Sequence, residues 1–455
     1  MLKSKIFNLV ALIVLAAMVL SACGGGGSAP AATGAPANPA ATNGSQASQP
    51  SGEPKELQVW IEWGDNPTQL QALFDKYTAQ SGVKVIVTAP VETDKFLPAL
   101  TGSEPPDIII RSGGDLVKSY AKEGLITELS GAIKTGGIDL SDIYSAPLQQ
   151  CESNGQIWCL PWGTDIYALY WNKDLFQAAG LDPNTPPKTM EELAQFADKL
   201  TKVGSDGKLQ QMGFIPDQAW GHQDLYARMF GGFWYNDDGT QLTANSQAMI
   251  DSLTWEQQFY KKYGYDNVTG FATDFGNQYM SPDYPFYTGK LAMLVDGEWQ
   301  TGPNFITKFK PELNYGVAPF PPPAAHPELA NTAVVQGTVV ILPANAKYPD
   351  ASAKLMAWLE SPAVVAEEMC INANLPTSKK AAQDPCFTSN AKFKVFLDLM
   401  ANQNAKYIIT SPISSEFNDA YSNVEQAILH TGADPKTQLD QLQSDYSQKL
   451  QDALK

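Results

Sequence analysis

The apolar residues of this chain recur at two spacings, and their alternation predicts strands followed by helices. The run 57–61 is typical of a buried strand, and the apolar residues of 70–77 follow it at helical spacing. The runs 83–88 and 107–110 predict two more strands, and another amphipathic helix follows the second of them. Strands that alternate with helices favour an α/β domain with a mostly parallel sheet.

The same alternation starts again near residue 166, which predicts a second α/β region. A strand is expected over 166–171, and Thr189 and Glu192 have the spacing of a capping box at the start of a helix. A buried strand is expected over 291–295, and two helices joined at 432–435 end the chain. We therefore expect two α/β lobes with a cleft between them.

Composition narrows the class of partner. The chain has 455 residues, a formal net charge of -17 and 10 tryptophans. An acidic balance of this size opposes nucleic acid and an anionic membrane surface as primary partners. The aromatic count exceeds what a plain scaffold needs, so some of the rings are candidates for binding a ligand.

The N-terminus has the features of a leader. Lys3 and Lys5 precede an apolar run, and small residues lead to Cys23. This pattern is typical of a signal peptide over 1–22 and resembles the bacterial lipoprotein box, in which the cysteine carries the lipid. An uncleaved membrane anchor is the alternative. The segment 23–52 then predicts a lipidated cysteine and a disordered tether, because 24–52 lacks charges, aromatic rings and branched aliphatic residues.

The remaining cysteines are four, an even number that suggests disulfides outside the cytoplasm. Three pairings are possible, of which Cys151 with Cys159 and Cys370 with Cys386 are the most local. Asn154-Gly155 predicts a hairpin turn between the first two cysteines. With three histidines and no CxxC motif, we expect no Cys/His metal site and no cofactor.

Carboxylates and aromatic rings gather at the carboxyl ends of the predicted strands, where α/β proteins usually bind ligands. Sugars need flat rings for stacking and planar polar groups for hydrogen bonds, and these residue types supply both. Trp63 and Trp299 could instead close hydrophobic cores, and Asp65 and Asp115 could cap helices. The strand-end candidates for ligand binding are Glu62, Trp63, Asp65, Ser112, Asp115, Glu298 and Trp299.

Three motifs occur in a characteristic order along the chain. They are Trp171-Asn172-Lys173-Asp174, the segment Pro187 to Glu192, and the segment Gly289 to Trp299. Together they make the chain similar to the family-1 extracellular solute-binding proteins of ABC importers, the maltose-binding-protein-like group. The resemblance runs from about residue 57 to the C-terminus, behind a lipoprotein-like leader.

The resemblance implies a two-lobe periplasmic-binding-protein-like fold (type II), in which hinge strands join the lobes. Each lobe is expected to hold a mostly parallel sheet flanked by helices. The implied boundaries are 53–165 with 313–372 for the first lobe and 166–312 with 373–455 for the second.

The resemblance also implies further ligand-binding positions. Asp165 matches a position that often binds ligand in the family, and Trp220 lies near one that is commonly aromatic. Gln336 and Gly337 precede a strand whose backbone often approaches the ligand. Asn418, at the start of the penultimate helix, is the last candidate.

The implied function is that of a lipid-anchored extracytoplasmic receptor rather than an enzyme. It would bind a mono- or oligosaccharide as a monomer and deliver it to the membrane permease of an ABC transporter. A secreted carbohydrate-active hydrolase would share some of these features, since paired carboxylates beside aromatic rings also describe a glycosidase cleft. A receptor for a non-sugar solute and a surface adhesin are also compatible with the sequence.

Overall fold

The computed structural model describes residues 54–455, except 65–66, 115, 219–220 and 274–277. The predicted leader, Cys23 and the tether lie outside the described residues, as do Asp65, Asp115 and Trp220. Within the described ranges, no helix combines the length and apolarity that crossing a membrane requires. The described residues belong to one unit, Gln49–Lys455.

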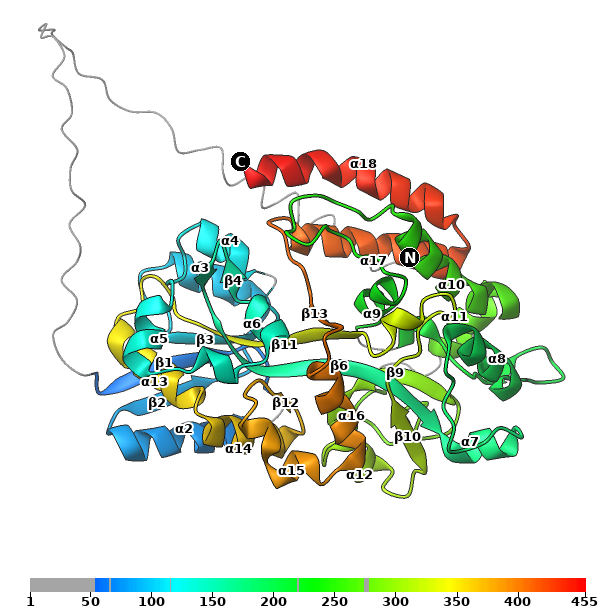
Figure 1. Cartoon of the computed structure of the whole chain (residues 1–455), viewed down its shortest axis with the longest axis horizontal. Helices are drawn as coiled ribbons and strands as arrows, with labels where there is room; N and C mark the ends of the chain where they lie inside the picture. Colours follow the sequence, from blue (N-terminus) through cyan, green and yellow to red (C-terminus); the bar gives the residue numbers. More distant parts are fainter. Residues whose placement is uncertain (1–53, 65–66, 115, 219–220, 274–277) are drawn as a thin grey trace, which may run out of the picture. The chain divides into compact units, whose positions relative to one another are not determined.

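A nine-stranded sheet runs through the described residues, with the main path β10-β6-β11-β3-β1-β2 (Figure 1). The first strands, β1 with β2 and β1 with β3, pair in parallel, whereas β11 runs antiparallel to both β3 and β6. The predicted α/β fold class is confirmed, and the sheet is mixed because the chain returns across it in β6 and β11. Its strands are β1 (Glu56–Ile61), β2 (Lys84–Thr88), β3 (Ile108–Ser112), β6 (Leu160–Asn172), β9 (Met293–Gly297), β10 (Tyr315–Ala318), β11 (Ala333–Ile341), β12 (Leu375–Pro376) and β13 (Ala405–Tyr407).

Strand β6 is shared by two parts of this sheet (Figure 1). Its first half, from Leu160 to Ile166, pairs with β11, and its second half, from Tyr167 to Asn172, pairs with β9 and β10. The sequence predicted only 166–171 for this strand. Pro161 interrupts the apolar pattern before residue 166, and the pairing of β6 with β11 shifts register beside it, between Thr338 and Val339.

Helices cover the sheet, and α2 packs against β2 in the order expected of a β-α-β unit. Thr189 caps α8 as predicted, because its Oγ1 accepts a hydrogen bond from the Glu192 N–H at 3.1 Å. The helices are α2 (Pro67–Ser81), α3 (Phe96–Thr101), α4 (Val117–Lys122), α5 (Ser130–Gly136), α6 (Ser145–Gln149), α7 (Lys173–Ala178), α8 (Met190–Leu200), α9 (His222–Met229), α10 (Gln247–Tyr263), α11 (Tyr265–Thr273), α12 (Ile306–Phe309), α13 (Pro349–Leu359), α14 (Pro362–Asn372), α15 (Pro385–Thr388), α16 (Ala391–Met400), α17 (Ser414–Thr431) and α18 (Pro435–Leu454).

Two disulfides join segments close in sequence. Cys151 pairs with Cys159 across the hairpin of β4 (Glu152–Ser153) and β5 (Gln156–Ile157). Asn154 and Gly155 both have positive φ there, as the expected tight turn requires. Cys370, in α14, pairs with Cys386, in α15. A second hairpin, β7 (Lys202–Val203) with β8 (Leu209–Gln211), follows α8.

Candidate functional site

A cavity of about 300 Å³ lies where the carboxyl end of β3 approaches α9, α17 and β11. This volume is at the lower end of the range typical of small-molecule sites. The strands β3 and β11 and the helices α9 and α17 all contribute residues to its wall. The cavity is lined by Arg111, Ser112, Gly113, Gly114, Gln150, Gln223, Asp224, Trp234, Gln336, Ile408, Thr410 and Asn418.

The end of β3 places the first polar group in this wall. Residues 108–110 of the strand are buried, and Ser112, at its end, is exposed. The Gly113 N–H then donates to the Gly337 carbonyl at 2.7 Å, which holds the turn after β3 against β11. A buried apolar strand that ends beside a neighbouring strand therefore presents Ser112 to the cavity.

Four residues of the wall carry buried polar atoms without a hydrogen-bond partner among the described residues. They are the amide Nε2 of Gln150, the carboxylate Oδ1 of Asp224, the indole Nε1 of Trp234 and the amide Oδ1 of Asn418. Burial raises the pKa of Asp224 to about 7, although Arg228 and His222 oppose that rise. Buried polar atoms are rarely left unpaired, because each costs about 1–3 kcal/mol. Two donors and two acceptors in one wall suit a ligand whose groups both donate and accept.

Trp234 is the aromatic residue of the wall. It is buried, and its ring packs on Phe233 at 5.1 Å and on Tyr421 at 5.0 Å between centroids. It was not among the predicted ligand residues, and its packing is that of a core residue. Its contact with the cavity was not foreseen, because nothing in its local pattern distinguishes a ring with one free edge from a fully enclosed one.

Glu62 follows β1 and lies beside the end of β3. Its Oε2 accepts from the Ser112 N–H at 2.7 Å, and its Oε1 accepts from the Thr93 hydroxyl at 2.6 Å. The Arg111 guanidinium lies 3.8 Å from the same carboxylate. Glu62 is thus held by several protein groups, and in this conformation it fixes the β1–β3 edge behind Ser112 rather than lining the cavity.

Trp63 stacks on Trp162, a residue near the start of β6. The ring centroids are 6.3 Å apart and the planes differ by 20°. Trp162 is fully buried and Trp63 is partly buried, and neither indole N–H has a partner within the described part of the chain. The pair joins the end of β1 to β6 and leaves one donor on each ring available.

Asp165 and Glu298 form a buried carboxyl pair at the point where β6 changes partners. Asn374 Nδ2 donates to Asp165 at 3.2 Å, and the Ile166 N–H donates to Glu298 at 3.1 Å. Burial, followed by the charge of Asp165, raises the pKa of Glu298 well above its usual range. A hydrogen bond between the two carboxyl groups needs a proton, and we assign that proton to Glu298.

Trp299 follows the end of β9 and is held there by a chain of hydrogen bonds. Its Nε1–H donates to the Tyr279 hydroxyl at 2.6 Å, and that hydroxyl donates to Asp296 Oδ1 at 2.7 Å. The indole meets the ring of Tyr167 edge-on at 6.1 Å, and the Tyr167 hydroxyl donates to Gln336 Oε1 at 3.3 Å. Trp299 therefore stands behind Tyr167 and Gln336, and Gln336 lines the cavity.

The close approach of β11 to β6 requires glycine at position 337. A β-carbon there would lie 2.4 Å from the Gly163 carbonyl oxygen and 2.7 Å from Thr164 Cα. Only glycine lets β11 approach β6 so closely. Gly337 does not line the cavity.

The structure thus brings Ser112, Gln336 and Asn418 together among the predicted ligand residues. Glu62, Trp63, Asp165, Glu298, Trp299 and Gly337 lie at the junction of β1, β6, β9 and β11 without lining this cavity.

Sequence reasoning missed Gln150, Gln223, Asp224 and Thr410. The polar pair Gln223-Asp224 closely follows Trp220, which was a predicted ligand residue. The prediction therefore pointed to the right segment, but because of its aromatic residue and not its polar ones. Gln150 lies beside a disulfide cysteine, and no periodicity marks it.

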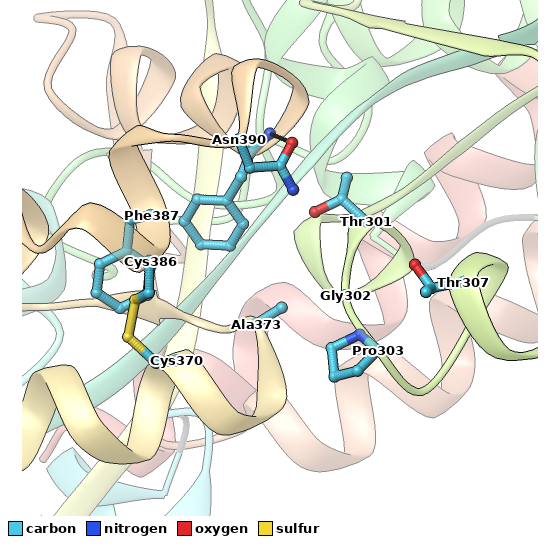
Figure 2. A pocket seen from close by; sticks show the side chains of 10 residues that line it. Thr301, Gly302, Pro303, Thr307, Cys370, Ala373, Cys386, Phe387 and Asn390 are labelled. Carbon is cyan, nitrogen blue, oxygen red and sulfur yellow. Dashed lines mark hydrogen bonds between the residues drawn. A yellow bond between two sulfur atoms is a disulfide. The ribbon is translucent and has the colours of Figure 1, made fainter. Parts of the chain in front are cut away.

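A second cavity of about 240 Å³ lies beside the Cys370–Cys386 disulfide (Figure 2). Thr301, Gly302 and Pro303 form one side of it, and Phe387 and Asn390 form the other. The Asn390 side-chain oxygen already accepts from the Lys392 and Phe393 N–H groups as the cap of α16. With this polar group engaged, the second cavity is the weaker candidate for a hydrophilic ligand.

Comparison with known proteins gives a family model that matches residues 62–366 and is described as "Bacterial extracellular solute-binding protein". A binding protein of Brucella abortus (strain 2308) is 25% identical over 284 residues, which cover 62% of this chain and 65% of that protein. The chain therefore spans slightly less than two thirds of this relative. The sn-glycerol-3-phosphate-binding periplasmic protein UgpB of Escherichia coli (strain K12) is 24% identical over 340 residues, 70% of this chain and 73% of UgpB.

Solved structures share the fold. CpMnBP1 with mannotriose bound has a TM-score of 0.76 and 29% identity, covering 86% of this chain and 99% of CpMnBP1. The sugar-binding protein MalE from Xanthomonas citri has a TM-score of 0.72 and 19% identity, covering 87% of this chain and 97% of MalE. At 19% identity, the comparison with MalE supports the fold and nothing further.

Proposed function

Because this chain belongs to the family of bacterial extracellular solute-binding proteins, we propose that it is the solute receptor of an ABC importer and binds a neutral oligosaccharide. The observation that carries the proposal is the set of unpaired polar atoms in the wall of the 300 Å³ cavity, on Gln150, Asp224, Trp234 and Asn418. A sugar hydroxyl donates and accepts, so it can satisfy both kinds of atom. The likeness to CpMnBP1, whose structure holds mannotriose, supports the same ligand class.

The charges of the wall favour a neutral ligand over an anionic one. Arg111 is its one arginine, and this side chain donates to the Gly113 carbonyl and lies 3.8 Å from Glu62. Asp224 adds a carboxyl group to the same wall. An anion such as a phosphate ester would compete with Glu62 for the guanidinium and would face Asp224.

The family and its structural neighbours are binding proteins, not enzymes. The carboxyl pair also fits a glycosidase poorly. Glycosidase carboxylates are separated by about 5–9.5 Å to admit the sugar or a water, whereas Asp165 and Glu298 are hydrogen-bonded to each other.

The place of action follows from the family, which is extracytoplasmic. Two disulfides suit that compartment. We further propose that Cys23 carries a lipid, that 23–52 tethers the receptor to the membrane, and that the protein acts as a monomer that docks on membrane permease subunits.

The lobe division is also a proposal. The strand-pairing change in β6 supports a first crossing near Asp165, and β12, which pairs with Gly163 and Thr164, supports a third crossing near Leu375. Since β10 pairs with the second half of β6, we move the second crossing from residue 313 to the segment between Ala318 and Ala333.

The remaining predicted residues are proposed to complete the cleft around the cavity wall. Trp63 and Trp299 would flank it with aromatic rings, and the proton shared by Asp165 and Glu298 would hold the crossing strands in register. The residues in this group are Glu62, Trp63, Asp65, Asp115, Asp165, Trp220, Glu298, Trp299 and Gly337.

Titration calorimetry on the full chain tests the proposal, with mannotriose, maltose and sn-glycerol 3-phosphate as separate ligands. We expect binding of an oligosaccharide that is recovered unaltered, and affinity reduced about 10-fold in Gln150→Ala, which removes one donor. Gln156→Ala, on the exposed β5, is the matched control and should bind as the wild type does. Binding of the phosphate ester alone, or hydrolysis of the sugar, would overturn the proposal.

A further inference from the structure

Three helices bring one histidine and two glutamates together beneath the cavity. His222 is the first residue of α9, Glu256 lies within α10 and Glu425 lies within α17. One atom of each side chain that could bind a metal lies within 4.8 Å of the corresponding atoms of the other two. His222 Nε2 is 3.0 Å from Glu425 Oε1. Because the three residues are far apart in sequence, their meeting depends on how the helices pack.

The cluster is buried and holds more acceptors than its protein partners satisfy. Glu256 is 1% exposed and Glu425 is 5% exposed. Ser252 Oγ reaches Glu256 Oε1 at 3.4 Å, but Glu256 Oε2 has no partner among the residues described. One imidazole cannot balance two buried carboxylates, and an unbalanced buried charge costs several kcal/mol. The site therefore has the chemistry of a place for a cation.

We propose that His222 Nε2 and the carboxylates of Glu256 and Glu425 bind a divalent transition-metal ion of the zinc type. Such ions take imidazole nitrogen at about 2.0–2.1 Å and carboxylate oxygen at about 2.0–2.2 Å. Two ligand atoms at those lengths lie about 2.8–3.0 Å apart at an octahedral angle and about 3.3–3.5 Å apart at a tetrahedral one. The His222–Glu425 distance of 3.0 Å matches the octahedral separation and is a few tenths of an ångström below the tetrahedral one. Glu256 completes the set through a small side-chain rotation, and water takes the open position.

Neighbouring groups orient the donors. Gln223 Nε2 donates to Glu425 Oε2, which fixes one oxygen of that carboxylate and leaves the other toward His222. Asp217, also nearby, is already held by the Tyr260 hydroxyl and by His430. Hydrogen bonds of this kind around a ligand set are typical of protein metal sites.

The metal would also act on the cavity, a consequence that rests on the proposed function. Gln223 lines the cavity and donates to the Glu425 carboxylate. An ion that fixes Glu425 fixes Gln223 with it. The metal-loaded receptor should therefore bind its solute more tightly than the metal-free protein.

The competing explanation is a plain ion pair between a protonated His222 and Glu425, with a protonated Glu256 beside it. The chain offers a matched control for this explanation. His326 Nδ1 lies 3.0 Å from Glu328 Oε1, so the atomic separation is the same, but that pair is exposed and has no third donor among the described residues.

Zinc titration of the purified, untagged full chain after chelator treatment separates the two explanations, and it needs no solute. We expect one ion per chain in the wild type and in His326→Ala, and binding weakened at least about 10-fold in Glu256→Gln, which keeps the shape and removes the charge. Thermal unfolding of the metal-free variant shows whether it folds. If it does not, Glu425→Gln and an anomalous difference peak between the three side chains at the zinc edge take its place.

No stoichiometric binding, or equal binding by Glu256→Gln, would overturn the proposal. The same holds if His326→Ala loses as much affinity as Glu256→Gln, or if the anomalous peak lies elsewhere. A chain that binds zinc at this site but no sugar would retain the metal site and refute the proposed function, so the two failures are distinguishable.

Discussion

The substitution Asp296→Asn should flatten the dependence of stability on pH. Asp296 is fully buried at the end of β9 and accepts hydrogen bonds from the Tyr279 hydroxyl at 2.7 Å, its neighbour Gly297 N–H at 2.8 Å and Gln300 Nε2 at 2.9 Å. Burial nevertheless raises its pKa to about 7. The free-energy cost of removing the charged carboxylate from water thus exceeds the stabilisation that these hydrogen bonds give to the charged form.

The magnitude follows from the pKa. A rise from 3.8 to about 7 corresponds to roughly 4 kcal/mol against the ionised native state, at about 1.4 kcal/mol for each pKa unit. Since the folded-state pKa lies above the unfolded-state value, the native protein holds an extra proton between about pH 4 and pH 7, and stability falls as pH rises through that window. Between pH 5 and pH 8 Asp296 alone should remove about 3 kcal/mol.

Urea unfolding of the wild type and the variant at pH 5 and pH 8 measures this. Asparagine cannot accept from Gln300 as the carboxylate does, which costs about 1–3 kcal/mol at both pH values and cancels in the difference. We expect the loss of stability between the two pH values to shrink by about 3 kcal/mol in the variant. Asp75→Asn, on the exposed side of α2, should keep the wild-type difference. A variant at position 296 that also keeps it would refute the reasoning.

Two further predictions concern the crossing strands. Gly337→Ala should lower the free energy of unfolding by about 3 kcal/mol, because its β-carbon would lie 2.4 Å from the Gly163 carbonyl oxygen; urea unfolding checks this, and a change below about 0.5 kcal/mol would contradict it. Trp299→Ala should weaken solute binding at least about 10-fold by calorimetry, because Tyr167 loses the ring that braces it against Gln336. Unchanged affinity would remove Trp299 from the site.

Most of the fold could be predicted because local patterns and global packing agree. The strands β1, β2 and β3, the capped helix α8 and the two C-terminal helices all carry strong periodicity or cap signals. Strand β6 was underestimated because its pairing partners, not its own pattern, extend it back to Leu160. The mixed direction of the sheet was missed for a similar reason, since strand direction depends on where the chain returns.

The candidate site was harder to predict because its polar residues come from loops and helix starts. Ser112 could be found since it follows a buried strand, and Gln336 was found through the family resemblance. Gln150 and Asp224 have no such marker, and only the structure shows that they share a wall and lack partners. The same holds for Glu256. Nothing in the sequence around it marks this residue, but in the folded chain it is buried and lies among possible metal ligands.

The shared strand β6 has a consequence for how the chain comes apart. Between Leu160 and Asn172 the backbone is hydrogen-bonded to β11 on one stretch and to β9 and β10 on the next, so no exposed linker joins the two halves of the sheet at this crossing. A protease needs a locally unfolded segment. This crossing provides one only after the hydrogen bonds between β6 and its neighbouring strands have broken. Limited digestion at this strand should therefore require cooperative unfolding of both halves, and neither half should be released from it as a stable fragment.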